Sequence, residues 1–222
     1  MPDNRDKTQK YFEREHADFD ATYSHNPGKI KDFVRWAQYW YGKKHIKGRL
    51  QALVDLVGDN IQNSKILEVG FGPGYYSIEL AKKGAKVTGI DYSKGMVEVA
   101  KHNARKDNLD IDFKESDVFD LSSNAAYKCV FATGVIEYIE RSEHERFLKK
   151  LRDLSNNIVI VSFPKKYVLH ALIRFVWLRF LKGFRISYFI ENDISQLAAN
   201  CGLQEIDRRD VGILWVIKFK KV

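Results

Sequence analysis

KILEVGFGPGYYS, residues 65–77, contains a short apolar run, three glycines spaced two apart, and the beginning of a helical pattern. The apolar run predicts a buried strand. Because glycine has no Cβ, the three glycines permit positive φ angles and a close approach of a ligand to the backbone. Strand, glycine turn and helix in this order bring backbone N–H groups and a helix N-terminus to a ligand. The segment therefore predicts a ligand-binding loop at the end of a strand.

A second strand follows with a carboxylate at its tip. Residues 85–90, AKVTGI, form another short apolar run, and Asp91 comes directly after it. In a doubly wound sheet the carboxyl ends of the strands border the crevice in which ligands bind. A carboxylate there can accept hydrogen bonds from both hydroxyls of a ribose.

The spacing of the glycines separates two nucleotide-binding families. The dinucleotide fingerprint G-x-G-x-x-G would need its third glycine where this chain has Tyr75. Here the glycines are Gly70, Gly72 and Gly74, and Glu68 precedes them. The block closely resembles motif I of the class I S-adenosylmethionine-dependent methyltransferases. In that family the loop holds the amino-acid part of the cofactor.

This resemblance covers residues 63–219 and implies the fold. We expect an α/β, doubly wound, mostly parallel seven-stranded sheet with an antiparallel C-terminal hairpin. The chain is then one methyltransferase domain, residues 1–222: N-terminal cover helices over 1–62, and a Rossmann-like core over 63–222 with a helical insertion after the fifth strand, at 165–188. Helices are expected near residues 33–41, 47–57, 94–106, 141–154 and 192–199.

The resemblance also implies which residues bind S-adenosylmethionine. Asp117 and Val118 match the segment that contacts adenine, with the carboxylate accepting from the adenine amino group and the next backbone N–H donating to the ring. An aromatic residue of the N-terminal helices is expected near the methionine moiety. The implied cofactor-binding residues are Tyr11, Tyr23, Glu68, Gly70, Phe71, Gly72, Gly74, Asp91, Tyr92, Asp117, Val118, Thr133 and Gly134.

Catalytic residues are less well defined by the sequence. Methyl transfer from a sulfonium has a neutral leaving group, so the enzyme chiefly positions the nucleophile and excludes water. Family members often have His at the position of Tyr138. The candidates on the acceptor side are Tyr11, His16, Tyr138 and His170, and no catalytic base is assigned. The six histidines show no paired ligand spacing, so no metal is expected.

The insertion at residues 165–188 has six basic residues, no acidic residue and many large apolar ones. Three interpretations are open: a helix packed on its own domain, a cover over the acceptor pocket, or an amphipathic helix at a membrane surface. The N-terminal segment lacks an apolar signal core, and no apolar run reaches the roughly 20 residues of a membrane span. We expect a cytoplasmic protein, with peripheral membrane contact as an alternative.

Composition bounds the function only broadly. Of 222 residues, 45% are hydrophobic and 30% charged, which is typical of a globular domain. The net charge of +8 favours an acidic partner such as nucleic acid, anionic lipid or a phosphorylated substrate. Cys129 lies in an expected strand and is interpreted as a core residue.

The main hypothesis is methyl transfer from S-adenosylmethionine to an O, N or C nucleophile of a small-molecule acceptor, as in the quinone- and porphyrin-modifying members. One alternative is an RNA methyltransferase that uses the basic surface. The segment 133–136, TGVI, lacks the Asn/Asp-Pro-Pro-aromatic motif common in nucleobase amino methylation. The other alternative, a catalytically silent binding protein, predicts a damaged cofactor loop, and the loop here is intact.

Overall fold

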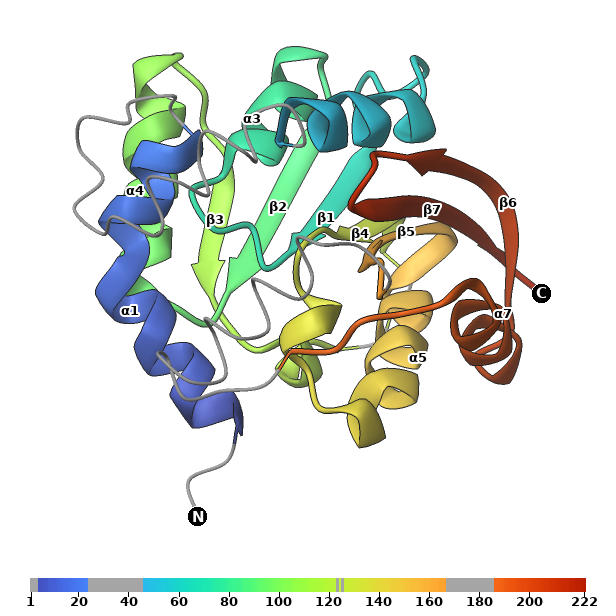
Figure 1. Cartoon of the computed structure of the whole chain (residues 1–222). Coiled ribbons are helices and arrows are strands. Elements are labelled where there is room, and N and C mark those ends of the chain that lie inside the picture. The colour runs from blue at the N-terminus through green and yellow to red at the C-terminus, as the bar shows by residue number, and fades with distance from the viewer. Residues whose placement is uncertain (1–3, 24–45, 123, 125, 167–185) are drawn as a thin grey trace.

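The computed structural model describes residues 4–23, 46–122, 124, 126–166 and 186–222 (Figure 1). Its described strands form one seven-stranded sheet with the order β3-β2-β1-β4-β5-β7-β6. Neighbours from β3 to β5 pair in parallel, whereas β7 is antiparallel to both β5 and β6. The predicted sheet, including its C-terminal hairpin, is confirmed. The strands are β1 Lys65–Val69, β2 Lys86–Asp91, β3 Asp112–Glu115, β4 Tyr127–Ala132, β5 Ser155–Pro164, β6 Leu203–Asp210 and β7 Leu214–Lys221.

Helices cover both faces of this sheet. They are α1 Asn4–Tyr23, residues 46–57, α3 Tyr75–Lys82, α4 Lys94–Lys106, α5 His144–Leu154 and α7 Glu191–Asn200. Three short 3-10 turns lie in the described connections: η2 Val118–Asp120, η3 Ile136–Tyr138 and η4 Arg141–Glu143. The helix expected over 141–154 therefore begins as a 3-10 turn and becomes α-helical at His144.

Two apolar cores lie on opposite faces because side chains alternate along each strand. Ile66 of β1 packs with the helix at 46–57, α3 and α4, whereas the next residue, Leu67, packs with α5 and α7. In β4, Cys129 and Val130 divide between the two cores in the same way. Burial on both faces explains the continuous apolar runs. Cys129 is a buried core residue, as predicted.

The order in which strands are added to the sheet changes side between β1 and β4. The segment β1–β2–β3 extends to one side of β1, and β4 lies on the other side. Such a topological switch point leaves a crevice outside the carboxyl ends of the two strands. The glycine loop at residues 70–74 follows β1 into this position, and the turn at residues 133–135 follows β4.

Helix α1 runs alongside α4, at the edge of the sheet that β3 forms (Figure 1). It contacts η3 as well, so it spans from the outer helix to the turn after β4. The expected helix at 33–41 and the centre of the insertion, residues 167–185, lie outside the described residues. The insertion's first residue, Lys165, pairs with Phe189 in an isolated bridge. Among the described helices, none is long and apolar enough to cross a membrane.

Candidate functional site

The glycine loop is held between β2 and the turn after β4. The Gly72 N–H donates to Asp91 Oδ2 at 3.0 Å. A Cβ on Gly70 would lie 2.4 Å from Val135 Cγ2, so only glycine allows this approach. Gly72 has φ of +52°, and a Cβ there would meet no described atom within 4 Å. The loop backbone at Gly72 therefore borders open space at the carboxyl end of β1.

Asp91 is buried at the tip of β2. Its Oδ1 accepts a hydrogen bond from the Ser93 N–H at 3.0 Å, while Oδ2 accepts from Gly72. Burial raises the pKa of Asp91 to about 6, and the nearby Glu13 carboxylate adds to the rise, whereas hydrogen bonds from the backbone of Ser93, Gly72 and Tyr92 oppose it. Each carboxylate oxygen has a second lone pair. The group can therefore accept further hydrogen bonds from a ligand's hydroxyls.

Glu68 lies beneath the glycine loop and is fully buried. Ser77 Oγ, on α3, donates to its Oε2 at 2.5 Å. Its other oxygen, Oε1, has no hydrogen-bond partner among the described residues. Burial raises the pKa of Glu68 to about 8, although the Ser77 hydrogen bonds and the charge of Arg49 counteract this. The end of β1 thus holds a buried acceptor atom that a ligand's donor can satisfy.

The raised pKa of Glu68 predicts a pH dependence of stability. Folding favours the protonated form, so the contribution of Glu68 is complete below its ordinary pKa of 4.5 and is lost as the pH rises through about 8. Glu68→Gln keeps the acceptor for Ser77 but cannot ionise. We expect the free energy of unfolding in urea to fall less between about pH 5 and pH 8.5 in Glu68→Gln than in the wild type. Equal pH dependence in both proteins would contradict this.

The end of β3 lies beside the end of β2. Asp91 pairs with Glu115, and the Ser116 N–H donates to the Asp91 carbonyl oxygen at 2.9 Å. Asp117 follows, with its Oδ1 accepting from the Phe119 N–H at 2.8 Å as the N-cap of η2. The segment implied in adenine binding is therefore next to the carboxylate implied in ribose binding.

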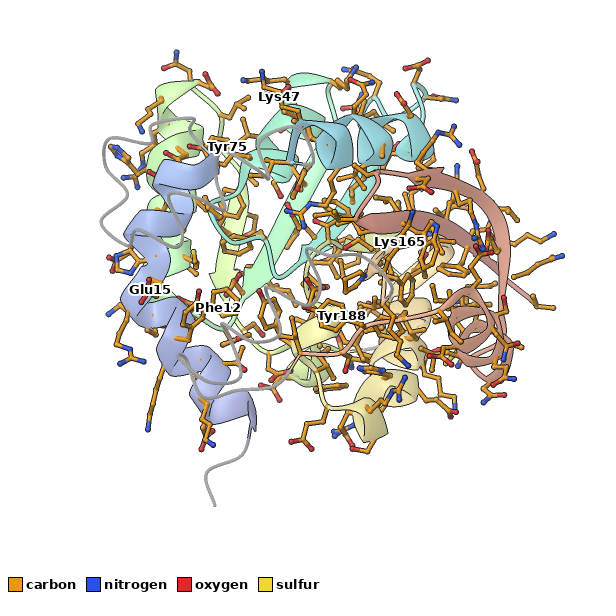
Figure 2. All side chains as sticks on the ribbon, viewed as in Figure 1. Phe12, Glu15, Lys47, Tyr75, Lys165 and Tyr188 are labelled. Atoms are coloured by element: carbon orange, nitrogen blue, oxygen red, sulfur yellow. The ribbon has the colours of Figure 1, made fainter. Side chains whose placement is uncertain are left out.

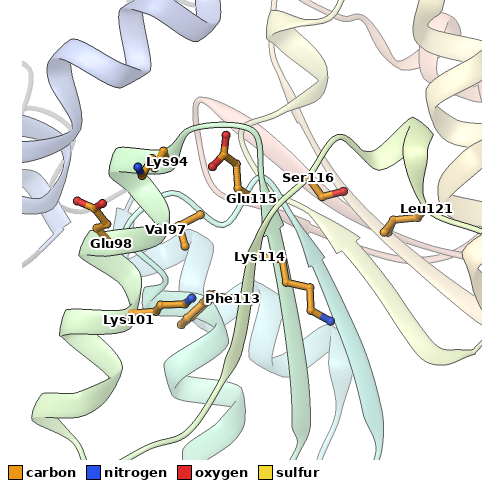
Figure 3. Close-up of a pocket in the computed structure, with 9 residues that line it drawn as sticks. All are labelled: Lys94, Val97, Glu98, Lys101, Phe113, Lys114, Glu115, Ser116 and Leu121. Carbon is orange, nitrogen blue, oxygen red and sulfur yellow. The ribbon is translucent and has the colours of Figure 1, made fainter.

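A shallow pocket of about 580 Å³ lies between α4 and β3 (Figure 3). Val97, Phe113 and Leu121 provide apolar lining, and Lys94 and Lys101 are among its charged residues. None of the implied cofactor residues line this pocket. It borders the adenine side of the candidate site, on the outer side of β3, and is separate from the switch point.

The turn after β4 completes the crevice. The Gly134 N–H donates to Ser162 Oγ at 2.8 Å, which ties the turn to β5. Thr133 is buried, and its hydroxyl has no hydrogen-bond partner among the described residues. Val135 of the same turn lies against Gly70, as described above. The implied residues Thr133 and Gly134 thus lie across the switch point from the glycine loop.

Arg49 lies beside the candidate site, and sequence reasoning did not identify it. It comes from the helix at 46–57, and its Nε donates to Tyr76 Oη at 2.5 Å. Its guanidinium lies over the Tyr76 ring, 5.4 Å from the centroid. Its Nη1 is 3.0 Å from where a Cβ on Gly134 would be. A cation therefore lies between the start of α3 and the turn after β4. No sequence motif marked it.

An aromatic cluster covers the carboxyl ends of the strands. It comprises Tyr11 and Phe12 of α1, Tyr138 of η3, and Ile186 and Tyr188, which end the insertion. Tyr11 is almost completely buried, and the ring centroids of Phe12 and Tyr138 are 5.1 Å apart. Figure 2 shows Phe12 on α1 and Tyr188 on the returning segment. We call these five residues the cover cluster.

The cover cluster also touches a cofactor candidate. The ring of Tyr92 lies 6.4 Å from that of Phe12, centroid to centroid, in an edge-on arrangement. Two of the four acceptor-side candidates, Tyr11 and Tyr138, are in the cluster. Phe12, Ile186 and Tyr188 were not predicted, because their proximity depends on tertiary packing.

The remaining predicted residues lie elsewhere. His16 packs at the interface of α1 and α4, where its ring is 3.0 Å from the position of a Cβ on Gly95. The Phe71 side chain is in the core against Phe113, with ring centroids 4.6 Å apart, so only its backbone borders the crevice. Gly74 is the N-cap of α3. His170 and the Tyr23 side chain lie outside the described part of the chain. Within that part, no group of three or more His, Cys, Asp or Glu residues could hold a metal ion.

Sequence comparison identifies related proteins. Residues 66–157 match a family described as a methyltransferase domain, in agreement with the resemblance seen in motif I. A ubiquinone biosynthesis O-methyltransferase of Pelagibacter ubique is 33% identical over 108 residues, covering 48% of this chain and 44% of that protein. A Methanocaldococcus jannaschii protein, named as a protein N5-glutamine methyltransferase, is 44% identical over 72 residues, which cover 32% of this chain and 34% of that protein. The chain thus matches less than half the length of either relative.

Solved structures share the fold over the whole chain. The magnesium protoporphyrin IX methyltransferase of Synechocystis has a TM-score of 0.74 with S-adenosylmethionine bound and 0.76 with S-adenosylhomocysteine bound. The structure with S-adenosylmethionine is 21% identical to this chain, and the match covers 100% of this chain and 99% of that one. The structure with S-adenosylhomocysteine is 22% identical, and the match covers 99% of this chain and 100% of that one. These matches establish the class I methyltransferase fold.

Proposed function

We propose that this chain, with a methyltransferase domain over residues 66–157, transfers a methyl group from S-adenosylmethionine to a small-molecule acceptor. The observation that carries the proposal is the hydrogen bond between Gly72 and Asp91 at the switch point, which sets a glycine loop beside a buried carboxylate. A Cβ on Gly72 would project into open space, so the loop backbone can approach a ligand closely.

The described residues fit the chemistry of this cofactor. Asp91 can accept from the ribose hydroxyls, and the neighbouring Asp117 and Val118 suit adenine. Glu68, with its unsatisfied Oε1, can accept a hydrogen bond from the amino group of the methionine part. Arg49, directed toward Gly134, suits its carboxylate. The Glu68 carboxyl group and the Arg49 guanidinium thus offer a hydrogen-bond acceptor for the amino group and a cation for the carboxylate of an amino acid.

The bound cofactor would supply an electrophilic methyl group on a sulfonium. The protein's own task is then to place the acceptor in line and to exclude water. The cover cluster provides an apolar, aromatic wall for that purpose, formed by α1, η3 and the end of the insertion. Tyr138 contributes its ring against Phe12. A proton acceptor is needed only for a neutral hydroxyl or a protonated amine, and we assign none.

The described ends of the insertion favour one interpretation of residues 165–188. Ile186 packs with Tyr11 in the cover cluster, and the Ser187 N–H donates to the Glu137 carbonyl oxygen at 2.7 Å. The C-terminal end of the insertion therefore lies on the acceptor side of the candidate site. We propose that the insertion covers the acceptor pocket. The cytoplasmic location stays a prediction. Flotation of the protein with vesicles containing anionic lipid would show instead that the insertion contacts membranes.

Arg49→Lys tests the proposed contact with the methionine carboxylate. Lysine keeps the charge but loses the planar, two-pronged geometry of arginine. We expect the dissociation constant for S-adenosylhomocysteine to rise about tenfold, as measured by calorimetry. Arg105→Lys, on the exposed end of α4, is the matched control and should bind like the wild type. Unchanged binding by Arg49→Lys would remove Arg49 from the site.

The acceptor class is tested by transfer of labelled methyl groups. The purified protein is incubated with methyl-labelled S-adenosylmethionine and, separately, with a catechol carrying an isoprenoid tail, a porphyrin carboxylate, an unmodified protein and total RNA. Label on one of the two small molecules is expected. Label on RNA alone would support the nucleic-acid alternative. Tight cofactor binding with no transfer to any acceptor would favour a catalytically silent protein.

A further inference from the structure

Helix α1 binds the N-terminus of α4 through one carboxylate. Glu13 Oε1 accepts from the Lys94 N–H at 2.7 Å, and Oε2 accepts from the Gly95 N–H at 3.3 Å. The first N–H groups of a helix have no partner within the helix, and they attract negative charge. Ser93 caps the same helix from within the chain, with Oγ accepting from the Met96 N–H at 3.3 Å. Glu13 supplies the additional acceptors from 81 positions away.

The backbone that Glu13 holds is continuous with the proposed ribose and adenine contacts. Only two residues separate Asp91 from Lys94, and Asp91 itself accepts from the Ser93 N–H. Gln9, one turn before Glu13, donates from Nε2 to the Tyr92 carbonyl oxygen at 3.1 Å. Helix α1 therefore makes polar contacts to three residues of the loop 92–95, immediately after the carboxylate.

The far end of α1 is linked to the glycine loop through Asn103 of α4. Asp20 Oδ1 accepts from Tyr75 Oη at 3.1 Å and from Asn103 Nδ2 at 2.8 Å. The same Asn103 amide donates to the Pro73 carbonyl oxygen at 3.1 Å. Tyr75 is the first residue of α3, and Pro73 belongs to the glycine loop. Helix α1 thus contacts the segment after Asp91 and the start of α3 directly, and it is linked to the glycine loop through Asn103.

Between Gln9 and Glu13, α1 carries part of the cover cluster. Tyr11 and Phe12 reach Tyr138 and the end of the insertion. The helix is therefore shared by the cofactor side and the acceptor side of the site. A shift of α1 would move the loop 92–95 and the aromatic wall together.

We propose that Glu13 is a positioning residue: by binding the N-terminus of α4 it fixes the loop after Asp91 in its cofactor-binding form and couples that loop to the acceptor cover on α1. The proposal rests on the proposed function. If cofactor binding depends on the contact between α1 and α4, then the bound cofactor must stabilise that contact by the same free energy. Cofactor binding should therefore slow hydrogen exchange of the α1 amides.

Glu13→Gln is the direct test. A glutamine has one acceptor oxygen and no charge, so one of the two hydrogen bonds is lost and the other is weakened. We expect the dissociation constant for S-adenosylhomocysteine to rise about tenfold by calorimetry. Glu98→Gln removes the same charge from the exposed face of α4 and should bind like the wild type. Melting temperatures of the unliganded variants report whether folding is affected.

Two further readouts separate positioning from general destabilisation. In wild-type protein, S-adenosylhomocysteine should slow hydrogen exchange of the amides of residues 9–20, and this protection should shrink in Glu13→Gln. The affinity of the wild type should also fall as the pH drops through about 6, where Asp91 becomes protonated. Without the Glu13 charge this midpoint should move to lower pH. The other titratable groups near Asp91, namely Glu68, Glu115 and Lys94, are unchanged in the variant.

The outcomes are distinguishable. If wild-type protein does not bind S-adenosylhomocysteine, the proposed function fails before Glu13 is tested. If the wild type binds and Glu13→Gln matches it in affinity, exchange protection and pH midpoint, the positioning role is overturned. Loss of affinity that is accompanied by an equal effect in Glu98→Gln would attribute the change to net charge and would also overturn it.

Discussion

Gly72→Val is expected to abolish measurable binding of S-adenosylhomocysteine. The valine Cβ would project into the space beside the loop, where no described atom lies within 4 Å, and its two methyl groups would occupy the position proposed for the ligand. Gly72 also has φ of +52°, a left-handed conformation that costs a residue with a Cβ about 1–2 kcal/mol. Binding should weaken by more than about a hundredfold in calorimetry, since a steric block acts on the ligand directly.

Gly58→Val is the matched control for the backbone strain. Gly58 has φ of +86°, and a Cβ there would likewise meet nothing within 4 Å, but it follows the helix at 46–57 and lies outside the proposed site. Both variants should therefore lose similar stability on heating, and only Gly72→Val should lose binding. Equal affinity in the two variants would show that the ligand does not approach the backbone at Gly72.

Asp91→Ala is expected to weaken S-adenosylhomocysteine binding by about 1–3 kcal/mol, which corresponds to about 5- to 150-fold. The variant removes the proposed acceptor for the ribose hydroxyls. It also leaves the Gly72 and Ser93 N–H groups without the carboxylate that they now contact, so the loop loses its tie to β2.

Asp91→Asn separates these two effects. Asparagine keeps the size and one acceptor oxygen, so it should retain more of the loop structure than alanine while still losing the charge. The exposed Asp59→Ala serves as a control for loss of an aspartate. We expect affinity to follow the order wild type and Asp59→Ala, then Asp91→Asn, then Asp91→Ala. Wild-type affinity in a folded Asp91→Ala would show that Asp91 is misassigned.

The fold could be predicted because its signals are local. The strand, the glycine turn and the helix of residues 65–82 are adjacent in sequence, and the glycines are required by the backbone itself. The continuous apolar runs predicted the central strands, and the predicted strand ends differ from the observed ones by only a few residues. The 3-10 turn at 141–143 was missed, because a single turn of tighter helix has the same residue pattern as the α-helix that follows it.

The site could be predicted only where a motif fixes it. Asp91 was identified from its position at a strand end and Gly72 from the glycine motif, and the structure brings them into hydrogen-bond contact. Arg49 was missed, since its closeness to Gly134 depends on how the helix at 46–57 packs. Glu13 was missed for the same reason: its partners Lys94 and Gly95 are more than 80 positions away.

Side-chain direction also limited the prediction. Phe71 lies within the motif, yet its ring points into the core against Phe113, where an apolar group gains most from burial. His16 is on the same helix as Tyr11, but its ring packs at Gly95 on the α4 side. A sequence pattern assigns a residue to an element, whereas its face is decided by packing.

The most direct test of the central claim is a calorimetric titration of the purified protein with S-adenosylmethionine, S-adenosylhomocysteine and NAD in parallel. The glycine spacing and the Asp91 carboxylate predict binding of the first two in the micromolar range and no binding of NAD. Binding of NAD alone would contradict the assignment of the loop, and binding of none of the three would contradict the proposed function as a whole.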